Sequence, residues 1–156
     1  MKYTKDNPKL VKDIFNFKKI NTFTGVVINE RKDIVYYLNG KLHREDGPAI
    51  EFANGNKEWF LNGEYHRENG PAVEHINGIE KWYLNGKYHR EDGPAIISKT
   101  WHKSWYLNGK RHREDGPAVE YISGNKEWRL NDKCYGVGDG YTNESWIRFV
   151  KLELLK

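Results

Sequence analysis

The chain of 156 residues carries 26 basic and 22 acidic side chains, is 37% hydrophobic, and holds a single cysteine. Its apolar runs fall far short of the about 20 residues that a membrane-spanning helix needs, and one cysteine excludes an internal disulfide framework and a multi-thiolate zinc site. This length favours one domain or one short repeat array, and because residues 1–6 lack the apolar stretch of a secretory signal, we expect a reduced, cytoplasmic setting.

The first 22 residues are the basic part of the chain. They hold six lysines against two aspartates, an excess that matches the formal net charge of +4 of the whole chain. Apolar residues at helical spacing between Pro8 and Lys18 predict a basic amphipathic helix, which makes residues 1–22 an N-terminal cap. A groove for nucleic acid needs a local positive excess, and the body of the chain has none overall, so we do not expect it to bind nucleic acid.

A 23-residue repeat organises the middle of the chain. The tract Tyr36–Gly40 (YYLNG) returns at steps of 23 residues, beginning at Trp59, Trp82 and Trp105, and in a degenerate form at Trp128. A second tract, HREDGPA, begins at His43 and returns with the same step. Such strict spacing is typical of units that stack on their neighbours, so residues 23–131 are predicted to form five β-hairpin repeats, the first of them degenerate.

Each repeat has the composition of β structure. Segments such as 49–53 and 57–61 are rich in aromatic and β-branched residues, and Asn54-Gly55 between them predicts a type I′ turn. The Asn-Gly of the LNG tract predicts a second tight turn, and Asp-Gly-Pro a third. Whether residues 41–43 form a further strand stays open. The predicted fold is therefore all-β, an elongated antiparallel meander of tandem hairpins.

Alternation along the strands assigns two faces. Trp59 and Leu61 with their counterparts form a predicted apolar stripe, joined by Ile50 and its counterparts. The opposite face carries an aromatic stripe of Tyr37, Phe60, Tyr83 and Tyr106.

Residues 132–156 are predicted to be a degenerate end of the array followed by a C-terminal cap. After Thr142 and Asn143, helical spacing places Trp146, Phe149, Val150 and Leu154 on one face of a helix from Glu144 to Leu155. Alternate residues of the same segment also fit a strand, and the two alternatives stay open here. Repeat arrays need atypical ends, because the last unit has no neighbour to cover its core.

The repeats resemble those of MORN-type proteins, in the variant W-Y-L-N-G-K-x-H-R-E-D-G-P-A that is often found in phages and large DNA viruses. The resemblance covers about residues 24–131, and the 23-residue period is the same. It implies an extended β-hairpin meander and a scaffolding or partner-binding role without catalytic residues. Standard members have paired glycines where Arg44–Asp46 stand here, so the phosphoinositide or membrane binding suggested for some of them is not expected.

The HRED tract has the residue types of an acid–base or metal site, but it occurs three times and once more as HREN at residues 66–69, and a catalytic site needs one copy. We interpret it as a repeated hydrogen-bond network that builds the turns, with no catalytic residue, no metal and no cofactor. The residues of this structural set are His43, Arg44, Asp46, His66, Arg67, Asn69, His89, Arg90, Asp92, His112, Arg113 and Asp115.

Function is expected where the repeats differ. Trp101, followed by His102 and Lys103, stands where sister hairpins have Gly, so it is a candidate anchor for a protein partner. The alternative is that Trp101 folds back over the sheet. The aromatic stripe of Tyr37, Phe60, Tyr83 and Tyr106 is a second candidate surface.

These observations favour a non-enzymatic protein that binds a host protein. With the viral resemblance and the Lys-, Asn- and Ile-rich composition, the hypothesis narrows to a phage-encoded inhibitor of a bacterial defence system in the host cytoplasm. One alternative is binding of a nucleotide or nucleic acid, and another is self-assembly through open sheet edges into a homo-oligomer.

Overall fold

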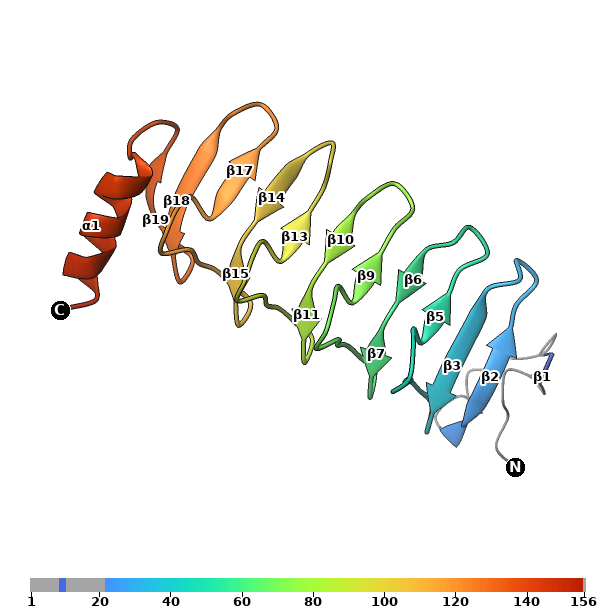
Figure 1. Cartoon of the computed structure of the whole chain (residues 1–156). Coiled ribbons are helices and arrows are strands. Elements are labelled where there is room, and N and C mark those ends of the chain that lie inside the picture. The colour runs from blue at the N-terminus through green and yellow to red at the C-terminus, as the bar shows by residue number, and fades with distance from the viewer. Residues whose placement is uncertain (1–8, 11–21, 156) are drawn as a thin grey trace. The chain divides into compact units, whose positions relative to one another are not determined.

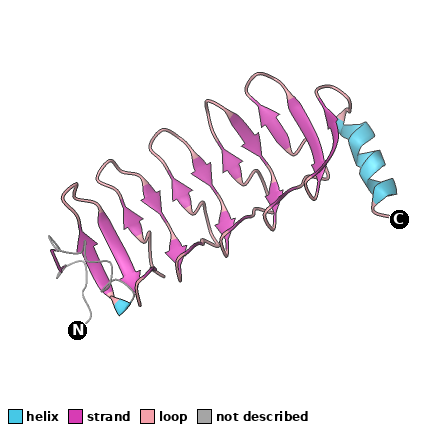
Figure 2. Ribbon diagram, turned by 180° about the vertical axis from the view of Figure 1, so that it is seen from behind, coloured by secondary structure: helices cyan, strands magenta, loops and turns pink. Residues whose placement is uncertain are grey.

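The computed structural model describes residues 9–10 and 22–155 (Figure 1). The chain divides into two compact units, one of residues 1–77 with 83–86, the other of residues 78–82 with 87–156. Each unit is built mainly from antiparallel β-strands in meander order, and the one α-helix of the described residues is C-terminal (Figure 2). The predicted all-β hairpin meander is confirmed.

In the first unit the sheet runs in the order β1-β2-β3-β5-β6-β9. The short strand β4 pairs with β3, and β7 pairs with β8 in a separate two-stranded ribbon. All these pairs are antiparallel except β1 with β2, which is parallel. The strands are β1 (Lys9–Leu10), β2 (Gly25–Ile28), β3 (Ile34–Leu38), β4 (Lys41–Leu42), β5 (Ile50–Glu51), β6 (Lys57–Glu58), β7 (Phe60–Leu61), β8 (Glu64–Tyr65), β9 (Val73–Glu74) and β11 (Tyr83–Leu84).

In the second unit the sheet runs in the order β10-β13-β14-β17-β18-β19, and β15 pairs with β16 in a separate ribbon. Helix α1 (Asn143–Glu153) follows the last strand. The strands are β10 (Glu80–Lys81), β12 (Lys87–Tyr88), β13 (Ile96–Ile97), β14 (His102–Ser104), β15 (Tyr106–Leu107), β16 (Lys110–Arg111), β17 (Val119–Tyr121), β18 (Lys126–Leu130) and β19 (Lys133–Val137).

The two kinds of Asn-Gly turn differ. At Asn62-Gly63 both residues have positive φ (54° and 88°), as a type I′ turn requires, and the turn joins β7 to β8. At Asn54-Gly55 only the glycine does (φ 91°), and Gly55 N–H donates to the Phe52 carbonyl. The predicted type I′ turn at Asn54-Gly55 is therefore wrong: the connection is a three-residue loop with glycine in the left-handed position.

The predicted strand 57–61 is divided at Trp59. Its backbone N–H donates to the Ala72 carbonyl at 2.8 Å, and the residues after it leave the main sheet for the β7–β8 ribbon. In the stripe, Trp59, Trp82 and Trp105 are half-buried, and only the last member, Trp128, is buried. Fully buried alanines that follow each Pro, together with Val73 and Val119, fill the centre of the core; the alanines are Ala49, Ala72, Ala95 and Ala118.

At the N-terminus, Lys9–Leu10 form a strand paired with Val27–Ile28, so the predicted helix is wrong for these two residues. The rest of the predicted N-terminal cap lies outside the described residues. At the C-terminus the helix is confirmed over the strand. Trp146 and Val150 are buried, as the predicted apolar face requires. Leu154, predicted for the same face, is 60% exposed, because the helix ends one residue before it, at Glu153.

Among the described residues, no helix is long and apolar enough to cross a membrane.

Candidate functional site

The HREDGP loop of each repeat is built around its arginine. Arg113 Nε donates to Asp115 at 2.7 Å, and Nη1 donates to the Pro117 carbonyl at 3.3 Å and to Glu120 at 2.9 Å. The guanidinium also lies 3.9 Å from the centroid of the Trp105 ring, a cation–π contact. One side chain thus joins the loop, the next strand and the preceding tryptophan.

The glycine of the loop makes room for this arginine. A Cβ at Gly116 would lie 2.8 Å from the Arg113 Cζ, closer than real Cβ contacts, although Gly116 does not have positive φ. At this position glycine is therefore needed for close approach and not for backbone freedom.

The same arrangement recurs in the other repeats. Arg44 and Arg90 each donate to the aspartate two residues later at 2.8 Å. The guanidiniums of Arg44, Arg67 and Arg90 lie 4.1, 3.8 and 4.1 Å from the rings of Tyr36, Trp59 and Trp82. The pKa values of Asp46 and Asp92 are lowered, because each carboxylate accepts a hydrogen bond from its arginine.

Each loop histidine links its repeat to the following one. His43 Nδ1 accepts the backbone N–H of Asn62 at 3.1 Å, and His112 Nδ1 accepts that of Asn131 at 3.3 Å. The equivalent bonds at His66 and His89 are both 3.2 Å. Nδ1 of His66 and of His112 also lies 2.8 and 3.1 Å from the side-chain oxygens of Asn85 and Asn131. On the other side of the ring, His112 Nε2 is 3.3 Å from Glu114. These four histidines therefore connect successive repeats by hydrogen bonds.

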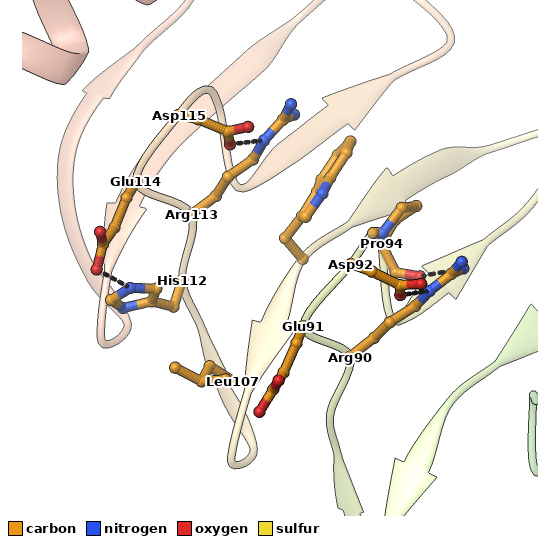
Figure 3. A pocket seen from close by; sticks show the side chains of 11 residues that line it. Arg90, Glu91, Asp92, Pro94, Leu107, His112, Arg113, Glu114 and Asp115 are labelled. Carbon is orange, nitrogen blue, oxygen red and sulfur yellow. Dashed lines mark hydrogen bonds and ion pairs between the residues drawn. The ribbon is translucent and has the colours of Figure 1, made fainter. Parts of the chain in front are cut away.

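A groove of about 780 Å³ opens between two successive loops of the second unit (Figure 3). Trp105 and Leu107 supply its apolar lining, and the loop residues 90–94 and 112–115 supply its walls. Four carboxylates stand against two arginines among the lining residues, and both arginines are bound to aspartates, as the dashed lines in Figure 3 show. We call this the Trp105 groove.

The first unit has the equivalent groove. It has a volume of about 460 Å³ and is lined by Trp59, Leu61 and the loop residues 44–47 and 66–69. Asn69 stands where the Trp105 groove has Asp115, so this groove carries one carboxylate fewer. We call it the Trp59 groove.

The turn between β13 and β14 departs from its sisters. Trp101 does not adopt the positive φ of Gly55 and Gly124, and its side chain is 68% exposed. Its ring meets the His102 ring edge-on with centroids 4.8 Å apart. The predicted anchor therefore lies at the surface and does not fold back over the sheet.

Ile122, from the next turn, is a neighbour that sequence reasoning missed. Its N–H donates to the Trp101 carbonyl at 3.0 Å, and its side chain is 70% exposed. In two sister turns the equivalent N–H donates to a side-chain oxygen: the Ala53 N–H donates to Asp33 Oδ1, and the Ile76 N–H donates to Asn56 Oδ1. This contact could have been predicted, because His102 has no side-chain oxygen to accept the Ile122 N–H. That N–H therefore needs another acceptor, which is the Trp101 carbonyl. Trp101, His102, Lys103 and Ile122 are together called the turn patch.

The charge of the turn patch is low. Burial lowers the pKa of the His102 imidazole, and the positive charge of Arg111 lowers it further, while Glu127 opposes both. His102 is thus neutral at physiological pH, and its Nδ1 is buried with no hydrogen-bond partner among the described residues. Lys103 is exposed and adds one positive charge at the edge of the patch.

The aromatic stripe is not an open surface. Phe60 is buried, and its ring lies 4.1 Å from that of Tyr65, which in turn stacks on Tyr83 at 4.8 Å. In the second unit Tyr106 lies 5.0 Å from Tyr88. The predicted surface of Tyr37, Phe60, Tyr83 and Tyr106 is half-buried or buried, because tyrosines of the short strands β8 and β12 fill the spaces between the repeats.

No metal centre is formed by the described residues, which contain no group of three or more His, Cys, Asp or Glu side chains able to hold an ion. The comparison with protein families finds no family model that matches the chain. No curated protein matches it significantly.

Proposed function

We propose that the protein is a non-enzymatic module that binds a host protein partner through the turn patch. The observation that carries the proposal is the pair of large apolar side chains, Trp101 and Ile122, exposed at 68% and 70% on two adjacent turns whose backbones are hydrogen-bonded to each other. Tryptophan is the residue type most enriched among binding hot spots. The patch is neutral at its centre, so its burial by a partner costs little desolvation of charge.

The loop residues support a role without catalysis. Each loop histidine accepts the same backbone N–H of the following repeat, each loop arginine lies on an aromatic ring, and exposed carboxylates stand around them. Carboxylates repel phosphate, which disfavours nucleotide or nucleic-acid binding at the loops. The narrower proposal, a phage-encoded inhibitor of a bacterial defence component, rests on the resemblance of the repeat variant and on the composition of the chain.

The test replaces the unusual residues of the turn at Trp101 with those of the equivalent turns. Trp101→Gly together with His102→Asn rebuilds the Gly-Asn sequence of residues 55–56 and 124–125, so this variant keeps or gains stability while losing the patch. In quantitative mass spectrometry of host lysate bound to the immobilised protein, we expect one protein to be enriched by the wild type and reduced about tenfold or more by this variant and by Ile122→Ala.

Ile76→Ala is the matched control, since Ile76 is equally exposed (73%) on a turn of the other unit and lacks a tryptophan neighbour. It should leave capture unchanged. Equal enrichment by the wild type and the restored-turn variant, with both folded by circular dichroism, would contradict the proposal.

A further inference from the structure

The Trp105 groove is separate from the turn patch and has a chemistry of its own. Its lining residues carry four carboxylates and two arginines. Arg90 is bound to Asp92 and Arg113 to Asp115, and each guanidinium lies on a tryptophan ring. Two carboxylates remain without an arginine, those of Glu91 and Glu114, so the charge of the groove is negative.

Glu91 and Glu114 are both accessible to a ligand in the groove. Glu91 is 83% exposed and Glu114 57% exposed, and they come from opposite walls of the groove. Figure 3 shows Glu91 and Glu114 on the two sides of Leu107. Among the residues that the structure describes, the ion-pair partner of each is a histidine Nε2, at 3.7 Å from Glu91 and 3.3 Å from Glu114. The carboxylates are therefore free to meet a ligand.

The floor of the groove is apolar. Trp105 and Leu107 are half-buried and both line it. A long side chain with an alkyl stem and a cationic end matches both features, because the stem packs on apolar surface and the charge reaches the rim. Lysine and arginine have this form. An anion or a phosphate would meet uncompensated negative charge.

We propose that the Trp105 groove is a docking site for a basic segment of a protein partner, with the side chain of one lysine or arginine between Glu91 and Glu114. Complementary charge of this kind raises the association rate and orients the partner. The Trp59 groove is a weaker copy, since it is smaller and Asn69 replaces an aspartate. This inference does not depend on the turn patch, and either proposal can fail without the other.

The experiment measures binding of blocked hexa-lysine and hexa-arginine peptides to the whole chain by isothermal titration calorimetry at about 50 mM salt. In ¹⁵N–¹H spectra the indole signal of Trp105, assigned with Trp105→Phe, should shift on addition of either peptide. The variant Glu91→Gln with Glu114→Gln should raise the Kd about tenfold or more. Both glutamates are exposed, so the variant should fold like the wild type.

The matched control is Glu30→Gln with Glu64→Gln, which removes the same charge from exposed positions outside both grooves. It should change the Kd less than about twofold. Asn69→Asp should strengthen binding at the Trp59 groove, seen as a larger shift of the Trp59 indole signal.

Equal weakening by the two double variants would mean diffuse attraction of a polycation and would overturn the proposal. The proposal is also overturned if the peptides bind without shifting the Trp105 signal, if they do not bind, or if a blocked hexa-glutamate or an oligonucleotide binds as tightly.

Discussion

Lys32 adopts the left-handed conformation (φ 69°) that the sister turns give to glycine. The pattern of the turn is unchanged there: Lys32 N–H donates to the Asn29 carbonyl, as Gly55 N–H donates to that of Phe52. A side chain with a Cβ is strained in this region, whereas glycine is not. Trp101 occupies the equivalent position of its own turn, but it does not adopt the left-handed conformation.

Lys32→Gly should therefore stabilise the first unit by about 1 kcal/mol, because it removes the strain of positive φ from an exposed residue. Urea unfolding followed by circular dichroism measures the change. Gly55→Ala is the opposite substitution at the sister position and should destabilise, also because its Cβ would lie 3.1 Å from Ile76 Cγ2. A loss of stability in Lys32→Gly would show that the turn depends on the lysine side chain.

At the scale of elements, the arginine of each loop holds together parts that are short by themselves. Most strands of the full repeats have only two or three residues and cannot be stable alone. Arg113 joins Asp115, Pro117 and Glu120 and covers Trp105. Arg90 makes fewer bonds, because Ile97 stands where the other repeats have glutamate.

Arg113→Lys should lower the free energy of unfolding by about 1–2 kcal/mol, since an ammonium cannot make the forked bonds and lie flat on the indole at once. Arg90→Lys is the matched comparison and should cost less, because Arg90 bonds to Asp92 and Pro94 and lies on Trp82 but has no bond to a glutamate equivalent to Glu120. Chemical unfolding monitored by tryptophan fluorescence tests both. Equal costs would show that the bond to Glu120 contributes nothing.

At the scale of the whole molecule, the second unit is closed by the helix and the last two strands. Trp146 is fully buried, its ring lies 5.4 Å from that of Trp128, and its Nε1 donates to the Arg113 carbonyl at 3.0 Å. Tyr135, Tyr141 and Phe149 surround this pair. The cluster gives the last repeat the apolar neighbour that the array no longer supplies.

Trp146→Ala should destabilise the second unit by about 3–5 kcal/mol, as expected for removing a buried aromatic ring and leaving a cavity. Leu152→Ala on the same helix should change little, since Leu152 is 66% exposed. Hydrogen exchange of β18 and β19 should rise in the first variant alone. Unchanged exchange there would show that the helix is not what closes the unit.

The prediction from sequence was best where a few neighbouring residues decide the conformation. The 23-residue step, the Asn-Gly turn of the LNG tract and the amphipathic C-terminal helix all follow from local preferences and are present in the structure. The turn at Asn54-Gly55 was predicted wrongly because Asn-Gly fits two loops of different length, and the choice depends on which residues pair across the hairpin.

Local sequence patterns are enough to predict the repeat unit, its β character and the interruption of the repeat pattern at Trp101. Which side chains are exposed depends on contacts between repeats. The histidine bonds reach 19 residues along the chain, Ile122 meets Trp101 across 21, and the Trp105 groove lies between loops 23 residues apart. Such contacts arise when one repeat stacks on the next, and no local preference within a repeat encodes the surface that the stacking creates.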